Sequence, residues 1–157
     1  MTTRRWPLYV AYQGEHHGSH YFNTTPLDYI NAGAIDGFGQ LLADNFVERE
    51  EIPGLPPTKD GVVQYFRILL AAFPDMRMDA KDLIASGDKA VARLRVSGTH
   101  KGEFMGIPAT GKSVSVKLID ITRFGDDGLA REHWGVADLL AMMQQLGVIP
   151  APGQSGS

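Results

Sequence analysis

Asp120 and His133 are the two residues whose types and spacing best suit acid–base chemistry. They lie in apolar segments that alternate with period two around a short turn rich in glycine and aspartate, and this pattern predicts a β-hairpin. The strands are expected at residues 114–124 and 130–137, and the turn at residues 125–128. If Phe124 pairs with Leu129, Asp120 faces His133 directly, and opposed Cβ atoms in such a pair are roughly 5 Å apart. A carboxylate and an imidazole would then lie within hydrogen-bond reach.

The Asp120–His133 pair is predicted to lie on a buried face. Asp120 shares its side of the strand with Val114, Val116 and Leu118, which are all apolar. Burial and pairing shift the pKa values of such groups toward the range in which they transfer protons near neutral pH. A buried Asp–His pair also occurs as a structural feature in which two polar groups satisfy each other. The catalytic and the structural interpretation both stay open at this point.

Glu48 and His100 are further candidates for an acid or a base. Glu48 ends a short predicted strand beside a helix, and the alternative for it is an exposed surface glutamate. His100 begins a predicted loop at residues 99–112 and is expected to reach the mouth of a pocket. The side chains or positions expected to contact a substrate are His100, Phe104, Leu118, Gly135 and Phe66.

Two further motifs have stronger non-functional interpretations. Residues 106–113 match the phosphate-binding pattern GxxxxGK[ST], but the residues after Ser113 alternate as a strand, whereas a phosphate loop needs a following helix. We therefore predict a loop between strands that has no nucleotide affinity.

The segment from Glu15 to His20 contains three histidines, but its glycine and the lack of a fixed scaffold favour a solvated loop over a metal site. No metal and no other cofactor is predicted.

The composition indicates one globular domain. The chain has 157 residues, of which 43% are hydrophobic and 21% charged, in the usual range for globular proteins. A formal net charge of −3 and the lack of a basic cluster disfavour a nucleic-acid partner. The sequence has no cysteine, no apolar run long enough to span a membrane and no secretory signal pattern. Thiol chemistry is therefore excluded, no membrane partner is expected, and a cytoplasmic location is the expectation.

The elements that must position the candidate residues form an α+β arrangement. An irregular arm is expected at residues 1–24, a domain at residues 25–150 and a flexible tail at residues 151–157. Apolar periodicity and capping residues predict helices at residues 26–31, 35–44, 59–73 and 137–146, and strands at residues 46–48, 77–86 and 89–100 besides the hairpin. Helices that precede a run of antiparallel strands predict N-terminal helices packed on a strongly curved, mainly antiparallel sheet. Such a cone-shaped, barrel-like fold encloses a pocket.

A series of short motifs resembles one known family. In chain order they are Tyr29-Ile30-Asn31-Ala32-Gly33, Leu42-Ala43-Asp44-Asn45-Phe46-Val47, Ala72-Phe73-Pro74-Asp75, Gly98-Thr99-His100-Lys101-Gly102, residues 106–112, Ile119-Asp120-Ile121, Glu132-His133-Trp134, Asp138 and Gln145-Leu146-Gly147. With them the chain resembles the SnoaL-like polyketide cyclase family of the nuclear transport factor 2-like superfamily. The resemblance implies a cone-shaped α+β fold, frequent dimers, a ligand inside the cone and no metal or redox cofactor. It also implies intramolecular aldol closure of polyketide rings by acid–base chemistry.

The chain departs from this family at Gly135. The resemblance places the catalytic aspartate of the cyclases two residues after His133, where this chain has a glycine that can neither take nor give a proton. An aspartate introduced at residue 135 is therefore expected to supply a base and, as a buried charge, to lower stability.

The superfamily also suggests a role for Glu48. Its ketosteroid-isomerase-like members carry a basic carboxylate near the position of Glu48.

Two functional hypotheses follow. The first is a cofactor-independent cyclase, isomerase or hydrolase that acts on an apolar polyketide- or terpenoid-like small molecule. His133 would exchange the proton, Asp120 would fix its tautomer, and Glu48 or His100 would supply a second acid or base. The second is a binding protein that kept the cone and lost the chemistry. A homodimer is expected from the resemblance in both cases.

Overall fold

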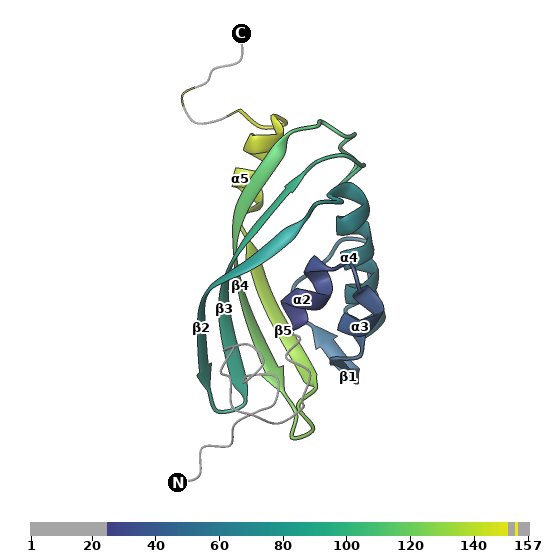
Figure 1. The fold of residues 1–157 in the computed structure, drawn as a ribbon, viewed down its shortest axis with the longest axis vertical. Coiled ribbons are helices and arrows are strands. Elements are labelled where there is room, and N and C mark those ends of the chain that lie inside the picture. Colours follow the sequence, from purple (N-terminus) through teal and green to yellow (C-terminus); the bar gives the residue numbers. More distant parts are fainter. Residues whose placement is uncertain (1–24, 151–152, 154–157) are drawn as a thin grey trace.

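The structure, a computed structural model, describes residues 25–150 and residue 153. Its centre is a five-stranded sheet in the order β1-β5-β4-β3-β2, where β1 runs parallel to β5 and the other neighbours are antiparallel. The elements are α2 (Pro26–Asn31), α3 (Ile35–Gly39), β1 (Leu42–Glu48), α4 (Lys59–Ala72), β2 (Arg77–Ser86), β3 (Lys89–Thr99), β4 (Ser113–Phe124), β5 (Ala130–Ala137) and α5 (Leu139–Leu146). Figure 1 shows a strongly curved sheet with α2, α3 and α4 on one side and α5 near one end. The predicted α+β cone is confirmed, with a sheet that curls without closing.

The helices α2 and α4 begin where their capping residues predict. Thr25 accepts a hydrogen bond from the backbone N–H of Asp28, whose carboxylate accepts in return from the Thr25 N–H, so the two form a capping box. Thr58 caps α4 in the same way by accepting from the N–H of Gly61. The predicted arm at residues 1–24 and most of the predicted tail at residues 151–157 lie outside the described residues.

Two predicted helix boundaries are wrong. The helix expected at residues 35–44 ends at Gly39, because Leu42 begins β1 and pairs with Ala130 of β5. Adjacent apolar residues such as Leu41 and Leu42 fit a helical stripe and a buried strand equally well, and pairing in the sheet decides between them. The helix expected from Ala137 begins at Leu139, because residue 137 still belongs to β5.

The hairpin of β4 and β5 has a different register from the predicted one. Asp120 pairs with Gly135, so the predicted direct pairing of Asp120 with His133 is wrong by two residues. The N–H of Gly125 donates to the carbonyl of Leu129 at 2.9 Å, which makes the loop shorter than expected, and a bulge in β5, where Arg131 lies between the partners of Arg123 and Phe124, adds to the offset. A shift of two residues preserves the face of every side chain, so Asp120 and His133 still lie on the same side of the sheet.

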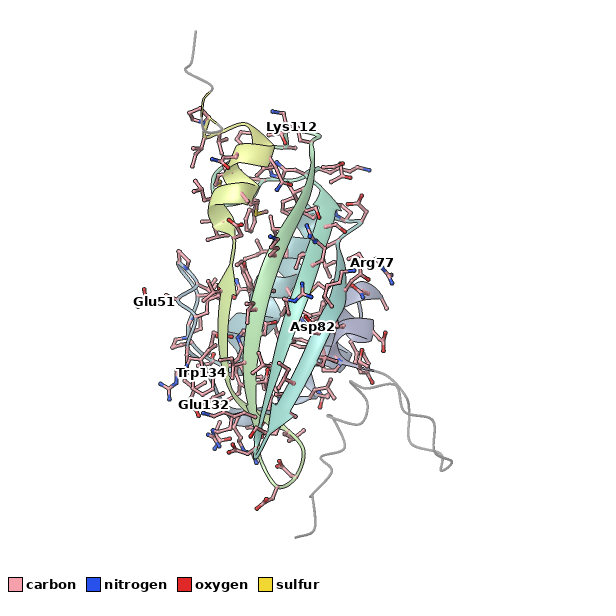
Figure 2. All side chains as sticks on the ribbon, turned by 90° about the vertical axis from the view of Figure 1, so that its left-hand side faces the viewer. Glu51, Arg77, Asp82, Lys112, Glu132 and Trp134 are labelled. Carbon is pink, nitrogen blue, oxygen red and sulfur yellow. The ribbon has the colours of Figure 1, made fainter. Side chains whose placement is uncertain are left out.

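The two faces of the sheet differ in what covers them. The buried core lies between the concave face and the helices, with Leu94 and Phe46 among its best-covered residues. Figure 2 looks onto the outer face, which carries Asp82 of β2 and Trp134 of β5. In the part of the chain that the structure describes, no helix is long and apolar enough to cross a membrane.

Candidate active site

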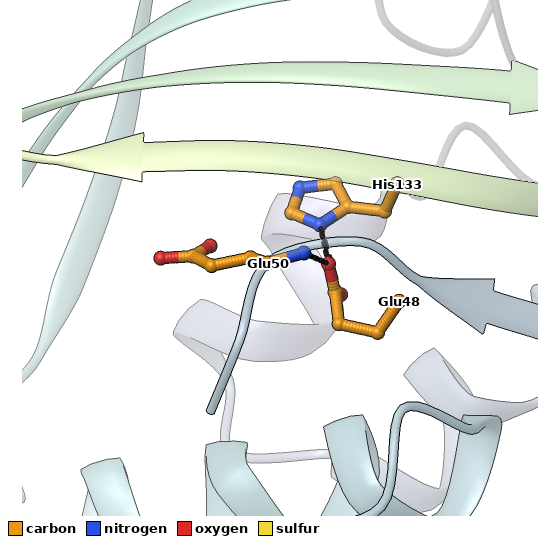
Figure 3. A group of neighbouring side chains, drawn as sticks. All are labelled: Glu48, Glu50 and His133. Carbon is orange, nitrogen blue, oxygen red and sulfur yellow. Dashed lines mark hydrogen bonds and ion pairs between the residues drawn. The ribbon is translucent and has the colours of Figure 1, made fainter. Parts of the chain in front are cut away.

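The candidate active site lies where β1, β4 and β5 meet on the concave face. Glu48, the last residue of β1, is the parallel register partner of His133 in β5. His133 Nδ1 lies 2.9 Å from each Glu48 carboxylate oxygen, and its Nε2 lies 3.2 Å from Asp120 Oδ1. Figure 3 shows the His133 ring beside the Glu48 carboxylate, with the bond between them. The fold thus brings together the three residues that the sequence analysis named for acid–base chemistry.

His133 is an imidazolium at neutral pH. Burial by itself would lower the pKa of His133, but its contacts with Asp120 and Glu48 and the charges of these two carboxylates outweigh burial and raise the pKa from 6.5 to about 10. Both ring nitrogens therefore carry protons. The Nδ1 proton is bonded to Glu48, whereas the contact with Asp120 lacks hydrogen-bond alignment and leaves Asp120 Oδ1 without a hydrogen-bond partner among the described residues.

Glu50 is a site residue that the sequence analysis missed. It follows β1, and its backbone N–H donates to Glu48 Oε1 at 2.8 Å (Figure 3). One carboxylate oxygen of Glu50, one of Glu48 and a ring nitrogen of His133 all lie within 4.8 Å of one another. Burial raises the pKa of Glu50. The charge of His133 lowers this pKa, whereas the charges of Glu48 and Asp120 raise it further. A weak signal for Glu50 is its place two residues after Glu48, since strand alternation would put both side chains on one face, but β1 ends at Glu48.

Gly135 adjoins this cluster but does not line the cavity. A Cβ atom on Gly135 would collide with Glu50 Oε2 and would lie 2.9 Å from His133 Cε1 and 3.1 Å from Asp120 Oδ1. The space beside residue 135 is thus already filled by the Glu50 carboxylate. The expected direct contact between Gly135 and a substrate is therefore wrong, because Glu50 covers the glycine.

An apolar cavity lies between the concave face of the sheet and the helices. Its volume is about 170 Å³, many times the 10–15 Å³ or so that one buried water needs. Of the residues expected to contact a substrate, Phe66, Phe104 and Leu118 line this cavity, together with Glu48, Asp120 and His133. Glu50 lines it as well, so the cavity is an apolar chamber with its charged groups gathered at one place. It can hold a small organic molecule.

His100 does not reach the cavity, and its expected place at the pocket mouth is wrong. The side chain is fully buried and stacks on Phe73 with ring centroids 5.1 Å apart. Its Nδ1 accepts a hydrogen bond from the backbone N–H of Thr110 at 3.3 Å. His100 therefore holds the loop between β3 and β4 against the end of α4, while its Nε2 is buried without a hydrogen-bond partner among the described residues.

Tyr65 of α4 is a second residue that the sequence analysis missed. It lines the cavity opposite the sheet. Burial, followed by the charges of Glu50 and Glu48, raises the pKa of Tyr65 to about 12. Its hydroxyl stays protonated at neutral pH and offers the cavity a neutral hydrogen-bond donor.

The cluster could in principle offer ligands to a cation. Glu48, Glu50 and His133 can each supply one ligand atom within the 4.8 Å spacing given above. In the structure, however, His133 Nδ1 is bonded to Glu48, so a cation would have to replace that bond. The arrangement is that of a hydrogen-bonded acid–base cluster. The histidines between Glu15 and His20 lie outside the described residues.

The curled sheet, the helices that cover its concave face and the apolar cavity between them, with a histidine and carboxylates at one wall, define a cone-shaped α+β fold with an internal cavity. The comparisons with known proteins name the family. The profile of the SnoaL-like polyketide cyclase family matches residues 22–146, and the chain belongs to this family. The comparison with curated proteins found no match.

Several solved structures are similar to this chain. TsrD from Streptomyces laurentii is 34% identical, with a TM-score of 0.72 over 78% of this chain and 90% of that one. AclR from Streptomyces galilaeus, described as a putative hydroxylase, is 29% identical, with a TM-score of 0.71 over 80% of this chain and 78% of that one. IdmH from Streptomyces antibioticus, described as a putative polyketide cyclase, is 30% identical, with a TM-score of 0.67 over 77% of this chain and 92% of that one.

Proposed function

We propose that this protein is a cofactor-independent acid–base enzyme of the polyketide-cyclase type, a cyclase, isomerase or hydrolase. Its substrate is an apolar, polyketide- or terpenoid-like small molecule that binds against Phe66, Phe104 and Leu118. The observation that carries the proposal is a histidine ring held between two carboxylates on the wall of an apolar cavity. Ionisable groups with perturbed pKa values inside a cavity are typical of sites that transfer protons.

The proposed catalytic group consists of His133, Asp120 and Glu48. Because the pKa of His133 is about 10, His133 is expected to act as a cation and proton donor, rather than as the resting base. The Nε2–H is poorly aligned with Asp120 and is available to the oxygen of a bound carbonyl compound. Negative charge that develops on that oxygen would be stabilised by the imidazolium. Glu48 holds the ring in place from the other nitrogen.

The reaction supported best is removal of a proton from a carbon next to a carbonyl group, followed by bond formation within the same molecule. General acid–base catalysis of this kind contributes about 100- to 10,000-fold, which suffices for activated carbonyl compounds. No net oxidation or reduction takes place, so the closure needs no redox partner.

Deuterium exchange tests the proposal. The probe is 2-tetralone, an apolar bicyclic ketone with acidic α-protons, incubated with the protein in D₂O and followed by mass spectrometry. We expect exchange well above the buffer rate with the wild-type protein and a decrease of about 100-fold with His133→Gln. A wild-type protein that binds the ketone without accelerating exchange would contradict the enzyme proposal.

The second candidate function is a non-catalytic small-molecule-binding protein. The observation in its favour is Gly135, which stands where the family resemblance places a catalytic aspartate. Native mass spectrometry of the freshly purified protein separates the two functions together with the exchange assay. A binding protein would retain a small molecule from expression and would leave 2-tetralone unexchanged.

A homodimer is also part of the proposal. Ile119 of β4 and Val136 of β5 are direct partners and are exposed at 49% and 75%. Because Asp120 faces the cavity, the alternation of the strand places Ile119 on the outer face. An apolar pair on that face supports contact with a second copy, which multi-angle light scattering would detect as twice the mass of one chain.

A further inference from the structure

We propose that Glu50 is the base that takes the substrate proton and returns it, and that residue 135 is glycine in order to make room for the Glu50 carboxylate. This inference rests on the proposed function and names the base within it. It assigns Gly135 a positive role in the site, where the sequence alone suggests a loss of chemistry.

The first observation is that Glu50 carries the uncommitted carboxylate of the cavity. Glu48 accepts hydrogen bonds from His133 and from the backbone of Glu50. Asp120 forms an ion pair with His133 at 3.2 Å. In the described part of the chain, the Glu50 carboxylate makes no hydrogen bond or ion pair, and Figure 3 shows its side chain extending away from Glu48. A base must be free to meet the substrate, and of these three carboxylates Glu50 alone has neither a hydrogen bond nor an ion pair in the described part of the chain.

The second observation is the position of the Glu50 carboxylate beside Gly135. Glu50 Oε2 is the atom nearest to the place that a Cβ atom on this glycine would take, closer than His133 Cε1 and Asp120 Oδ1, and it would collide with that Cβ. The backbone of Gly135 is outside the left-handed region, so the conformation of the chain does not require glycine there. The close approach of the Glu50 carboxylate, together with that of the His133 ring, leaves no room for a side chain at residue 135.

The third observation concerns proton affinity. Burial raises the pKa of Glu50, and the neighbouring carboxylates Glu48 and Asp120 add to the effect against the opposing charge of His133. A carboxylate whose pKa moves toward neutral pH is a stronger base in the pH range of the cell. The imidazolium beside it compensates the negative charge that forms on the substrate.

The proposed step balances without a further reactant. The Glu50 carboxylate takes a proton from a carbon next to a carbonyl group and becomes a carboxylic acid, and the electron pair of the C–H bond moves into the enolate. The enolate carbon then bonds to a second carbonyl carbon of the same molecule, whose oxygen becomes an alkoxide. The alkoxide takes the proton back from Glu50. The product is an isomer of the substrate, and Glu50 is again a carboxylate.

The experiment compares Glu50→Gln with its neighbour control Glu51→Gln. Glu51 is exposed and does not line the cavity. We expect Glu50→Gln to exchange 2-tetralone about 100-fold or more slowly than wild type, with a similar dissociation constant for the ketone by NMR titration. Glu51→Gln should exchange at the wild-type rate, and Glu50→Asp should recover part of the activity. The melting temperature of Glu50→Gln should not fall, because the substitution removes a partly buried charge.

The variant Gly135→Ala tests the second half of the proposal. Its methyl group would collide with Glu50 Oε2 and lie 2.9 Å from His133 Cε1, so we expect exchange to fall in Gly135→Ala and to fall by a clearly smaller factor when Gly135→Ala is added to Glu50→Gln. Such non-additivity is the signature of two residues that act through one contact. If the wild-type protein accelerates the exchange of 2-tetralone and Glu50→Gln does so at a rate within threefold of wild type, the role of Glu50 is overturned. The proposed function then still stands. A wild-type protein that binds 2-tetralone and exchanges it no faster than buffer would overturn both.

Discussion

Glu48 and His133 are direct register partners in the parallel pair of β1 and β5, and their side chains meet at 2.9 Å across 85 residues of sequence. Glu48 is buried, with 4% of its side chain exposed, and its oxygens also receive the backbone N–H of Glu50. This one carboxylate therefore fixes the ring of His133 and the start of the segment that carries Glu50. The contact between the two residues joins β1 to the hairpin of β4 and β5, and it forms the centre of the candidate site.

Replacement of Glu48 by alanine is expected to destabilise the fold by roughly 3 kcal/mol, because it leaves a buried imidazolium and a backbone N–H without their acceptor. Glu48→Gln should cost less, since the amide oxygen can still accept a hydrogen bond. The free energy of unfolding, measured with urea at pH 7, checks both values. Glu51→Ala is the matched control on an exposed neighbour. An alanine variant at residue 48 as stable as wild type would show that the pair does not stabilise the fold.

The raised pKa of His133 predicts how stability depends on pH. Its pKa in the folded state is about 10, above the value of 6.5 for an unperturbed histidine. The stabilising contribution of the protonated ring is therefore complete below pH 6.5 and is lost as the pH rises from 6.5 through about 10. The free energy of unfolding of wild type should fall over this range relative to that of His133→Gln.

An NMR titration of the His133 ring protons gives an independent measurement. The ring should stay protonated at pH 8 and titrate only at strongly alkaline pH. A midpoint near 6.5 would contradict the ion pairs with Glu48 and Asp120. The same titration in Glu48→Gln should show a lower midpoint, because one of the two carboxylates that hold the proton is gone.

The sequence predicted the shared face of Asp120 and His133, but not their register. Alternation with period two assigns a face to each residue and tolerates a shift of two, which is the shift that occurred. The helices with Thr caps could also be predicted, because their signals are local. The fold class followed from these elements and from the family resemblance.

The partners that complete the site could not be predicted from local patterns. The register of a parallel pair such as β1 and β5 depends on tertiary packing, so the contact of Glu48 with His133 is invisible in the sequence. Glu50 lies beyond the end of β1, where alternation is no longer a clear signal. The place of His100 at the start of the loop at residues 99–112 predicts that it reaches the pocket mouth, whereas packing on Phe73 buries it elsewhere. Long-range packing determines where Glu48, Glu50 and His100 lie, so local sequence patterns could not reveal their positions.

The loop at residues 106–112 is predicted to have no nucleotide affinity despite its match to a phosphate-binding pattern. Ser113 begins β4, so no helix N-terminus follows the loop to hold a phosphate. Calorimetry with ATP and Mg²⁺ should show no binding to the wild-type protein. Micromolar binding that disappears in Lys112→Ala would contradict this prediction.

Gly135→Asp is expected to lower stability and activity, because the structure fills the space at residue 135 with the Glu50 carboxylate. The sequence alone predicts that this aspartate supplies a base. The structure reverses that expectation for the single variant. A new carboxylate would meet Glu50 and Asp120 at close range, and like charges in a partly buried site repel. We expect the melting temperature to fall by roughly 5 °C or more, on the scale of 2–4 °C for each kcal/mol in a domain of this size. Gly135→Asn, which has the same size without the charge, separates repulsion from crowding.

The double variant Glu50→Ala/Gly135→Asp completes this test, because it moves the carboxylate from the segment after β1 to β5 and keeps it beside His133 and Asp120. Removal of the Glu50 side chain relieves the closest contact of a Cβ atom at residue 135 and leaves those with His133 Cε1 at 2.9 Å and Asp120 Oδ1 at 3.1 Å. The double variant should therefore melt at a higher temperature than Gly135→Asp and exchange 2-tetralone faster than Glu50→Ala. Thermal unfolding and the deuterium assay measure the two effects on the same samples. A double variant no more active than Glu50→Ala, but as stable as wild type, would show that a carboxylate at this point does not take the substrate proton.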